Sequence, residues 1–174
     1  MLTLPPGPKR FHGTSAHYSE AAEPLQRQAL LRWADGARQA GLAVAASLDL
    51  ETMPEMVAAT ALCDVVGVGC DFKYRRIGET LPGEYRAEFA PDELDAHQPQ
   101  AYRQVIRRQY LETVRARQPL LHVVFAETER GVFSYSRLTV PLAVRTGEVG
   151  RLWLIPSGFS RFAERLREES VQAA

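Results

Sequence analysis

Residues able to bind a small ligand alternate along the strand predicted for residues 131 to 142. Phe133, Tyr135 and Arg137 share one face of that strand, because successive side chains of a strand point to opposite faces. Aromatic rings offer stacking and apolar area, and a guanidinium offers paired donors for a carboxylate or phosphate. The pattern predicts a pocket for a small acidic or amphipathic molecule.

Similar side chains occur on the other predicted strands. The strand over residues 148 to 155 places an arginine, a tryptophan and an isoleucine on one face, and a histidine able to titrate near neutral pH lies in the strand over residues 120 to 126. The expected ligand contacts are Tyr74, Arg75, His122, Tyr135, Arg137 and Trp153. The alternative stays open that the aromatic residues are plain core and that the arginines point outward. If the pocket exists, Arg137→Ala should weaken binding by about 1.5–3 kcal/mol.

The cysteines and histidines do not form a typical cofactor or metal site. The run GVGCDF superficially resembles the cysteine motif of flavin-binding light sensors, but Cys70 falls between two predicted strands and the chain contains no asparagine. No two histidines have the short spacing of a strong metal site, and Cys63 and Cys70 form no CxxC pair. We therefore expect no metal, disfavour flavin and haem, and expect two free thiols.

A helix predicted from Pro99 to Arg117 carries several arginines against the single acid Glu112. An anionic partner is one interpretation. The other is a charged outer face that the preceding acidic segment, residues 84 to 95, neutralises. The whole chain has 21 basic and 21 acidic side chains, which disfavours nucleic acid as a partner.

The chain of 174 residues, 45% of them hydrophobic, is long enough for one globular domain with extensions. No apolar run approaches the roughly 20 residues needed to span a bilayer, and the first residues lack the pattern of a signal peptide. We therefore expect no membrane partner and a cytoplasmic location.

Three parts are expected along the chain. Residues 1–22, rich in proline, glycine, serine and histidine, are expected to form a mobile tail, because three early prolines block a helix. Residues 23–157 form the main domain, which begins with an amphipathic helix from Pro24 to Gln39. Residues 158–174 form a C-terminal helix whose apolar residues recur at helical spacing.

Within the main domain, the order of elements predicts a small antiparallel sheet. A short helical turn near residues 53 to 59 leads into strands over residues 61 to 68 and 71 to 80. The long helix follows, and then three strands over residues 120 to 126, 131 to 142 and 148 to 155. Gly131 and Gly147 allow the tight turns between the last three. The predicted fold is α+β, with five antiparallel strands and helices over one face.

Three runs, DFKYRRIGETLPGEYRAEF, QYLETVRARQPL and YSRLTVPLAVRTGEVGRLWLI, are similar to the PAS-fold family of short alphaproteobacterial sensory domains. The resemblance covers roughly residues 25 to 157. The positions that carry it are Trp33, Asp49, Phe72, Tyr74, Arg75, Gly78, Pro141, Leu142 and Gly147. Arg76 and Glu79 depart from it, since the family prefers an aliphatic and a small hydroxyl residue there.

The resemblance implies a non-enzymatic signalling module, in which helices and a five-stranded sheet enclose a small cavity and flanking helices pass a shift of the sheet to a protein partner. Two alternatives stay open. A cone-shaped enzyme of the ketosteroid-isomerase kind would need an inward carboxylate. A scaffold would form a homodimer through the flanking helices, although each apolar stripe could equally cap its own sheet.

Overall fold

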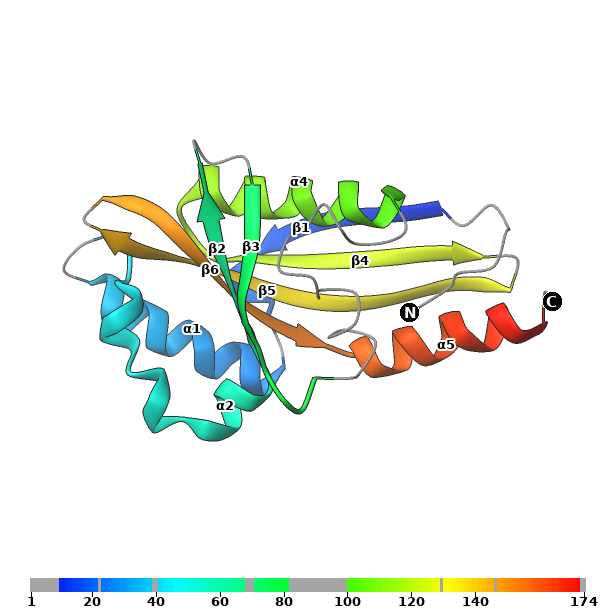
Figure 1. Cartoon of the computed structure of the whole chain (residues 1–174), viewed down its shortest axis with the longest axis horizontal. Coiled ribbons are helices and arrows are strands. Elements are labelled where there is room, and N and C mark those ends of the chain that lie inside the picture. The colour runs from blue at the N-terminus through cyan, green and yellow to red at the C-terminus, as the bar shows by residue number, and fades with distance from the viewer. Residues whose placement is uncertain are drawn as a thin grey trace.

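The computed structural model describes residues 10–21, 23–38, 41–67, 71–81, 100–128, 130–145 and 147–172. Over these residues the fold is α+β, with six antiparallel strands in one sheet and helices packed against it (Figure 1). The strands are β1 (Arg10–His17), β2 (Ala61–Val66), β3 (Asp71–Ile77), β4 (Leu120–Thr128), β5 (Gly131–Arg145) and β6 (Glu148–Ser157). The helices are α1 (Pro24–Ala37), α2 (Pro54–Ala58), α4 (Gln100–Ala116) and α5 (Phe159–Gln172), with 3-10 turns η1 (Tyr18–Glu20), η2 (Ala45–Leu48) and η3 (Leu50–Thr52).

The strand order in space is β1-β4-β5-β6-β2-β3. After β1, α1 and α2 comes the hairpin β2-β3, then the crossover helix α4, and then a meander of β4, β5 and β6 whose last strand pairs with β2. This chain order agrees with the predicted one. The predicted count of five strands is corrected to six, because β1 adds a strand at the β4 edge.

β1 also corrects the expectation of a mobile tail over residues 1–22. It pairs with β4 along its whole length, from Arg10 opposite Glu127 to His17 opposite Leu120. The early prolines block a helix, but they lie before residue 10 and leave the following residues free to add to a sheet edge. Residues 1–9 lie outside the described part of the chain.

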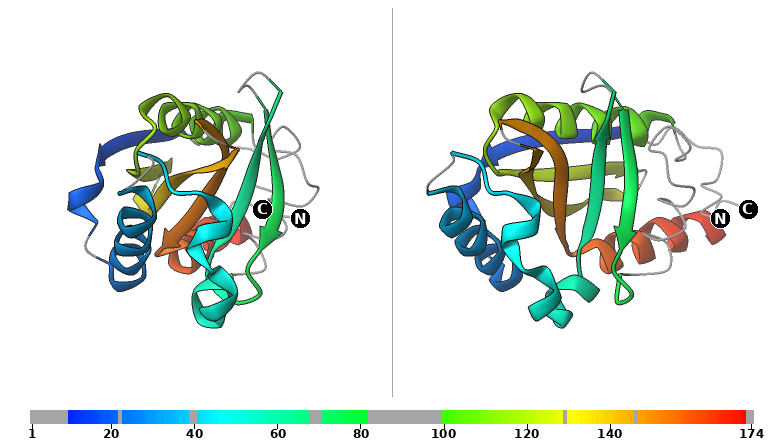
Figure 2. Two further views of the ribbon diagram at one scale, coloured as in Figure 1. Left: turned by 90° about the vertical axis from the view of Figure 1, so that its left-hand side faces the viewer. Right: turned by 60° about the vertical axis from the view of Figure 1, so that its left-hand side comes forward.

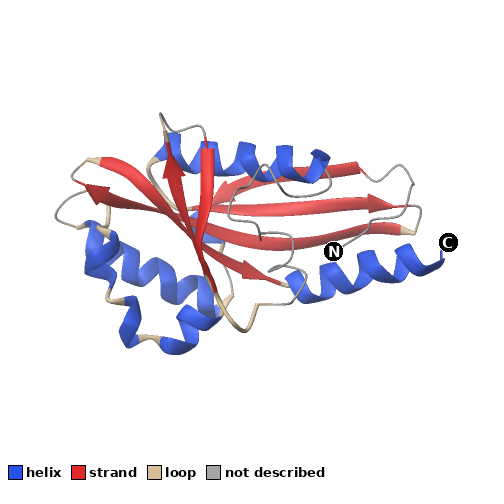
Figure 3. Cartoon of the chain, viewed as in Figure 1, coloured by secondary structure: helices blue, strands red, loops and turns tan. Residues whose placement is uncertain are grey.

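Helices cover both faces of the sheet, whereas the sequence predicted helices over one face (Figures 2 and 3). α4 and α5 pack on one face, where Leu152 and Leu154 of β6 belong to their core cluster. α1 and α2 pack on the other, against Trp153 and Ile155 of the same strand. Because both faces of β6 are apolar, each needs a cover, and the sheet separates two hydrophobic cores.

α1 is fixed to its own sheet by polar contacts as well as by packing. It begins with Pro24, as predicted, and Gln26 donates to the backbone oxygen of Ile155 at 3.1 Å. The indole Nε1 of Trp33 donates to the backbone oxygen of Pro141 at 3.0 Å. α1 therefore covers the face of the sheet that carries Trp153 and Ile155. Within the described ranges, no helix is long and apolar enough to cross a membrane.

Candidate functional site

A fully buried arginine occupies the face of the sheet covered by α4. Arg137, on β5, donates from Nη2 to Oε1 of Gln109 at 2.8 Å, from Nη1 to the hydroxyl of Tyr135 at 3.2 Å, and from Nε to Oγ1 of Thr139 at 3.4 Å. Its Cζ atom lies 4.8 Å from the ring centre of Tyr110. Burying a guanidinium without hydrogen-bond partners costs much free energy, so the folded state depends on these contacts.

Two tyrosine pairs extend this cluster. The hydroxyls of Tyr102 and Tyr135 are 2.7 Å apart, as are those of Tyr74 and Tyr110. In each pair one tyrosine comes from α4 and the other from a strand. Burial raises the pKa of Tyr110 far above its ordinary value, so its hydroxyl stays neutral. We call the following residues the Arg137 cluster: Tyr74, Tyr102, Gln109, Tyr110, His122, Tyr135, Arg137 and Thr139.

His122 lies at the border of the Arg137 cluster, opposite Arg137 on the neighbouring strand. Its Nδ1 atom is 2.9 Å from Oγ1 of Thr139. Nε2 is buried without a hydrogen-bond partner in the described part of the chain, and the nearest carboxylate oxygen, from Glu112, is 3.9 Å away. Burial, with a smaller effect of Arg137, lowers the pKa of His122 well below its usual range. The imidazole is therefore neutral at pH 7.

Gln109 positions the Arg137 cluster between α4 and the β1–β4 edge. Its Nε2 atom donates to the backbone oxygens of Thr14 at 3.4 Å and Val123 at 3.3 Å. The strand β1 passes so close that a Cβ atom at Gly13 would lie 2.5 Å from Nε2 of Gln109 and 2.6 Å from Cγ1 of Val105. The absence of a side chain at Gly13 therefore allows Gln109 to reach both strands.

The structure brings four of the six expected ligand residues together and separates the other two. Tyr74, His122, Tyr135 and Arg137 all belong to the Arg137 cluster, on the α4 side of the sheet. The predicted alternation of Tyr135 and Arg137 with the apolar Leu138 is confirmed.

Trp153 and Arg75 lie apart from the Arg137 cluster. Trp153 faces α1 and α2, and its indole donates to Oγ1 of Thr60 at 2.9 Å. Arg75 is largely exposed and pairs with Asp64 at 2.8 Å. Tyr135 lies on the face of the sheet covered by α4, whereas Trp153 lies on the face covered by α1 and Arg75 is directed toward Asp64. Neither residue can therefore share a pocket with Tyr135.

The polar residues that α4 contributes were missed by the sequence analysis. The sequence prediction concerns the arginines of this helix, whereas its buried face holds Tyr102, Gln109 and Tyr110. A helical repeat of three and four residues connects them with Val105 and Ile106, and this signal would have found them. Among the arginines, Arg107 pairs with Asp71 at 3.0 Å and Arg108 with Glu112 at 3.9 Å. The acidic segment predicted to neutralise them, residues 84 to 95, lies outside the described residues.

Comparison with known proteins found no matching family model, and neither curated proteins nor solved structures gave a significant match. Within the described residues, no group of three or more histidine, cysteine, aspartate or glutamate side chains is placed to hold a metal ion. Of the two cysteines, Cys63 is a buried free thiol, and Cys70 lies outside the described part.

Proposed function

We propose that the chain is a PAS-like sensory domain that is not an enzyme and that acts in the cytoplasm. It binds a small acidic or amphipathic molecule, or relays a protein contact, through the Arg137 cluster. The observation that carries the proposal is the contact of Arg137 with Gln109, which joins the middle of the sheet to α4 through a buried guanidinium. A polar network of this kind is sensitive to any group that enters it, because each lost contact inside a protein is costly.

Tyr135 gives the Arg137 cluster a route to the C-terminal helix. Its hydroxyl contacts Tyr102 and Arg137, while its ring lies 5.0 Å from the ring centres of Phe159 and Phe162 on α5. A ligand or partner that moved Tyr135 would therefore move α5. A response requires different affinities for the two positions of this side chain.

The first test is native mass spectrometry of the full chain, with an absorbance spectrum of the same sample. A stoichiometric small-molecule mass supports the ligand branch of the proposal and identifies its chemistry. Hydrogen exchange of α5 is then compared between the wild type and Tyr135→Phe, which keeps the ring but removes the hydroxyl. Faster exchange in α5 supports coupling, whereas unchanged exchange and unchanged ligand binding contradict it. Tyr18→Phe, on the other face of the sheet, is the matched control.

The alternatives of a cone-shaped enzyme and a dimeric scaffold receive less support. The inward carboxylate that the enzyme needs is not provided by Asp64, because it lies away from the Arg137 cluster and pairs with Arg75 and Arg151. The apolar stripe of α1 and the residues Phe159 and Phe162 of α5 are buried against their own sheet, which favours capping over pairing. Light scattering of the purified chain tests the homodimer.

A further inference from the structure

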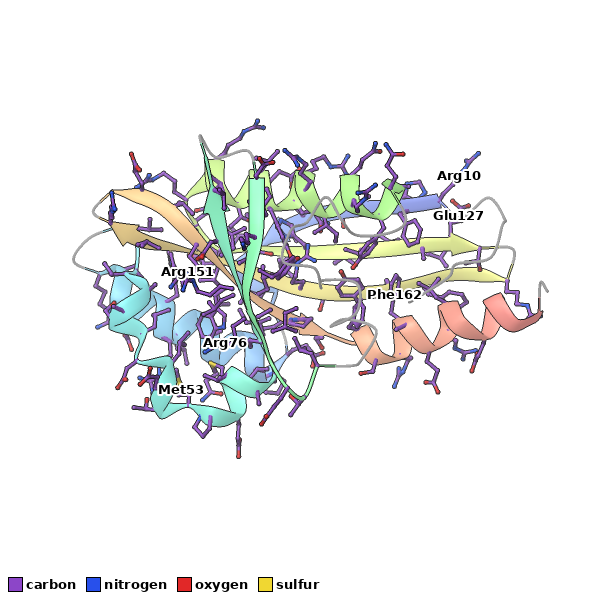
Figure 4. The ribbon with its side chains drawn as sticks, viewed as in Figure 1. Arg10, Met53, Arg76, Glu127, Arg151 and Phe162 are labelled. Atoms are coloured by element: carbon purple, nitrogen blue, oxygen red, sulfur yellow. The ribbon has the colours of Figure 1, made fainter. Side chains whose placement is uncertain are left out.

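A cavity of about 480 Å³ lies between α2 and the end of β3. Its walls include Glu51, Pro54, Val57, Arg76, Ile77 and Glu79. In Figure 4, Arg76 lies between the β2–β3 hairpin and the segment that carries Met53. The volume falls within the range of about 300–1,000 Å³ that is typical of sites for small molecules. This cavity is separate from the Arg137 cluster, since it lies beside α2 and no residue of that cluster lines it.

Arg76 lines the cavity, and two of its three guanidinium nitrogens have no hydrogen-bond acceptor within the described ranges. These two nitrogens, Nε and Nη2, are buried. The nearby carboxylate of Asp64 is already held by Arg151 at 2.7 Å and Arg75 at 2.8 Å. Burial, and to a smaller extent the positive charge of Arg151, lower the pKa of Arg76. A guanidinium in this environment would be stabilised by an anion.

A bulge in the β2–β3 hairpin turns Arg76 toward this side of the sheet. Cys63 pairs with Tyr74, but the preceding residue Leu62 pairs with Arg76, so that Arg75 is an extra residue on β3. An extra residue reverses the alternation of faces beyond it. Tyr74 therefore faces α4, whereas Arg76 shares the side of Leu62, whose neighbours are the residues packed beneath α1 and α2.

The wall of the cavity is held in place by backbone contacts between the residues that follow β3 and those at and just after the end of α2. The amide of Gly78 donates to the oxygen of Thr60 at 2.9 Å, and the amide of Thr80 donates to the oxygen of Ala58 at 2.9 Å. A Cβ atom at Gly78 would lie only 2.1 Å from that oxygen of Ala58. This close approach positions Arg76 and Glu79 on either side of Gly78 at the cavity.

We propose that this cavity binds a small amphipathic monocarboxylate, with its acid group on Arg76 and its apolar body against Pro54 and Val57 of α2. The lining combines one guanidinium with the apolar side chains of Pro54, Val57 and Ala58, which matches a molecule with one acidic end. Nε and Nη2 lie against protein atoms in this structure, so we expect the guanidinium to turn toward the bound acid.

The two acidic residues of the lining restrict the charge of the ligand. Glu51 and Glu79 are both exposed at the cavity, where they oppose a second negative charge. A dianion such as inorganic phosphate would meet this repulsion and would leave the apolar wall uncovered. The site should therefore prefer a monocarboxylate to phosphate.

Isothermal titration calorimetry of the full chain with hexanoate, 1-hexanol and inorganic phosphate tests the proposal. We expect saturable binding of hexanoate and at least about tenfold weaker binding of the other two probes. Arg76→Met should weaken hexanoate binding by about tenfold or more, and Arg75→Met, which removes the same charge from the same strand outside the cavity, should change it less than about twofold. Val57→Phe keeps Arg76 but fills the cavity, and it should also weaken binding.

Four outcomes would overturn the proposal: no saturable binding of hexanoate, equal binding of 1-hexanol, tighter binding of phosphate, or equal losses in Arg76→Met and Arg75→Met. If Arg76→Met does not fold, Val57→Phe decides the matter alone, because unchanged binding in that variant excludes the cavity. Arg76 and Val57 lie outside the Arg137 cluster, so a loss of hexanoate binding in their variants reports on this cavity, whereas binding that is unchanged in both variants would place hexanoate elsewhere. The proposed sensory function and this site can therefore fail separately.

Discussion

The Nη2 atom of Arg137 donates to Oε1 of Gln109 at 2.8 Å, and both side chains are buried between β5 and α4. Through Nε2, Gln109 in turn donates to the backbones of β1 and β4. One arginine on the sheet is thereby linked through one glutamine to a helix and to two further strands. The stability of this region depends on side-chain polar contacts as well as on apolar packing.

Arg137→Met should lower the free energy of unfolding by about 2–4 kcal/mol, because it leaves Gln109, Tyr135 and Thr139 buried with a lost donor. Urea unfolding followed by circular dichroism measures the change. Arg75→Met, at a largely exposed ion pair, should cost no more than about 1 kcal/mol. Equal losses of unfolding free energy in the two variants would show that the buried contacts of Arg137 stabilise the fold no more than an exposed ion pair does.

Two glycine substitutions should differ in severity. At Gly78 an added methyl group meets the backbone oxygen of Ala58 at 2.1 Å, whereas at Gly13 it meets the side chains of Gln109 and Val105. Side-chain ends can move more easily than backbone, so Gly78→Ala should destabilise by about 3 kcal/mol or more and Gly13→Ala by about 1–3 kcal/mol. Thermal and urea unfolding would establish the order. A larger loss for Gly13→Ala would contradict the geometry.

Acid should destabilise the protein through His122. Its pKa is near 6.5 when unfolded and well below that when folded, so below about pH 6.5 the unfolded chain binds a proton that the native state refuses. The free energy of unfolding should therefore fall with decreasing pH, by up to about 1.4 kcal/mol per unit, until the native pKa is reached. Two charged groups face the imidazole ring. The positive charge of Arg137 on β5 lowers the pKa of His122 further, as burial does, whereas the carboxylate of Glu112 on α4 favours the protonated ring.

Urea unfolding of the wild type and His122→Gln between pH 7 and pH 5 measures this dependence. The variant should lose part of the slope, since glutamine does not titrate. His12→Gln, which replaces an exposed imidazole on β1, is the matched control. A wild-type slope that survives in His122→Gln would remove His122 as its source.

Cys63 should be unreactive in the folded protein. Burial, with a smaller effect of Asp64, raises the pKa of its thiol far above the ordinary value, so the reactive thiolate is scarce. In a Cys70→Ser background, a disulfide reagent should label Cys63 at least about tenfold faster in denaturant than in native buffer. Equal rates would show that the β2 region opens readily.

Arg76→Met should stabilise the protein in the absence of added acid, by about 1 kcal/mol, because it replaces buried donors that lack acceptors with an apolar group. Thermal unfolding with and without hexanoate measures this. The ligand should raise the melting temperature of the wild type and not that of the variant. A destabilised Arg76→Met that still gains stability from hexanoate would count against the acid-binding role.

The elements from β2 to α5 were predictable from the sequence because each carries a local signal. Alternation identified β5, and glycines at residues 131 and 147 marked the ends of hairpins with positive φ angles, as the structure confirms. β1 lacked such a signal: its residues are half exposed, and its partner β4 lies more than 100 residues away in the sequence. Only the long-range pairing reveals it.

The residues of the candidate site were predictable where the alternation of side chains along a strand is enough to assign each one to a face of the sheet. Tyr135 and Arg137 follow from the alternation of β5. Arg76 does not, because the bulge opposite Leu62 shifts the register in a way that the residue types do not mark. Trp153 shows the remaining difficulty, since both faces of β6 are apolar and composition cannot tell which one meets α4.

The position of β1 has a consequence for self-association. β1 is the outermost strand at one end of the sheet, and its backbone satisfies the outward groups of β4. β1 is itself an edge strand, but its residues are exposed or half-buried and mostly polar, whereas those of β4 are largely buried and apolar. A chain lacking residues 1–17 would therefore present a more hydrophobic edge that another molecule could extend. The N-terminal strand thus covers an apolar edge with a polar one, and its loss should favour pairing of β4 between two copies of the chain.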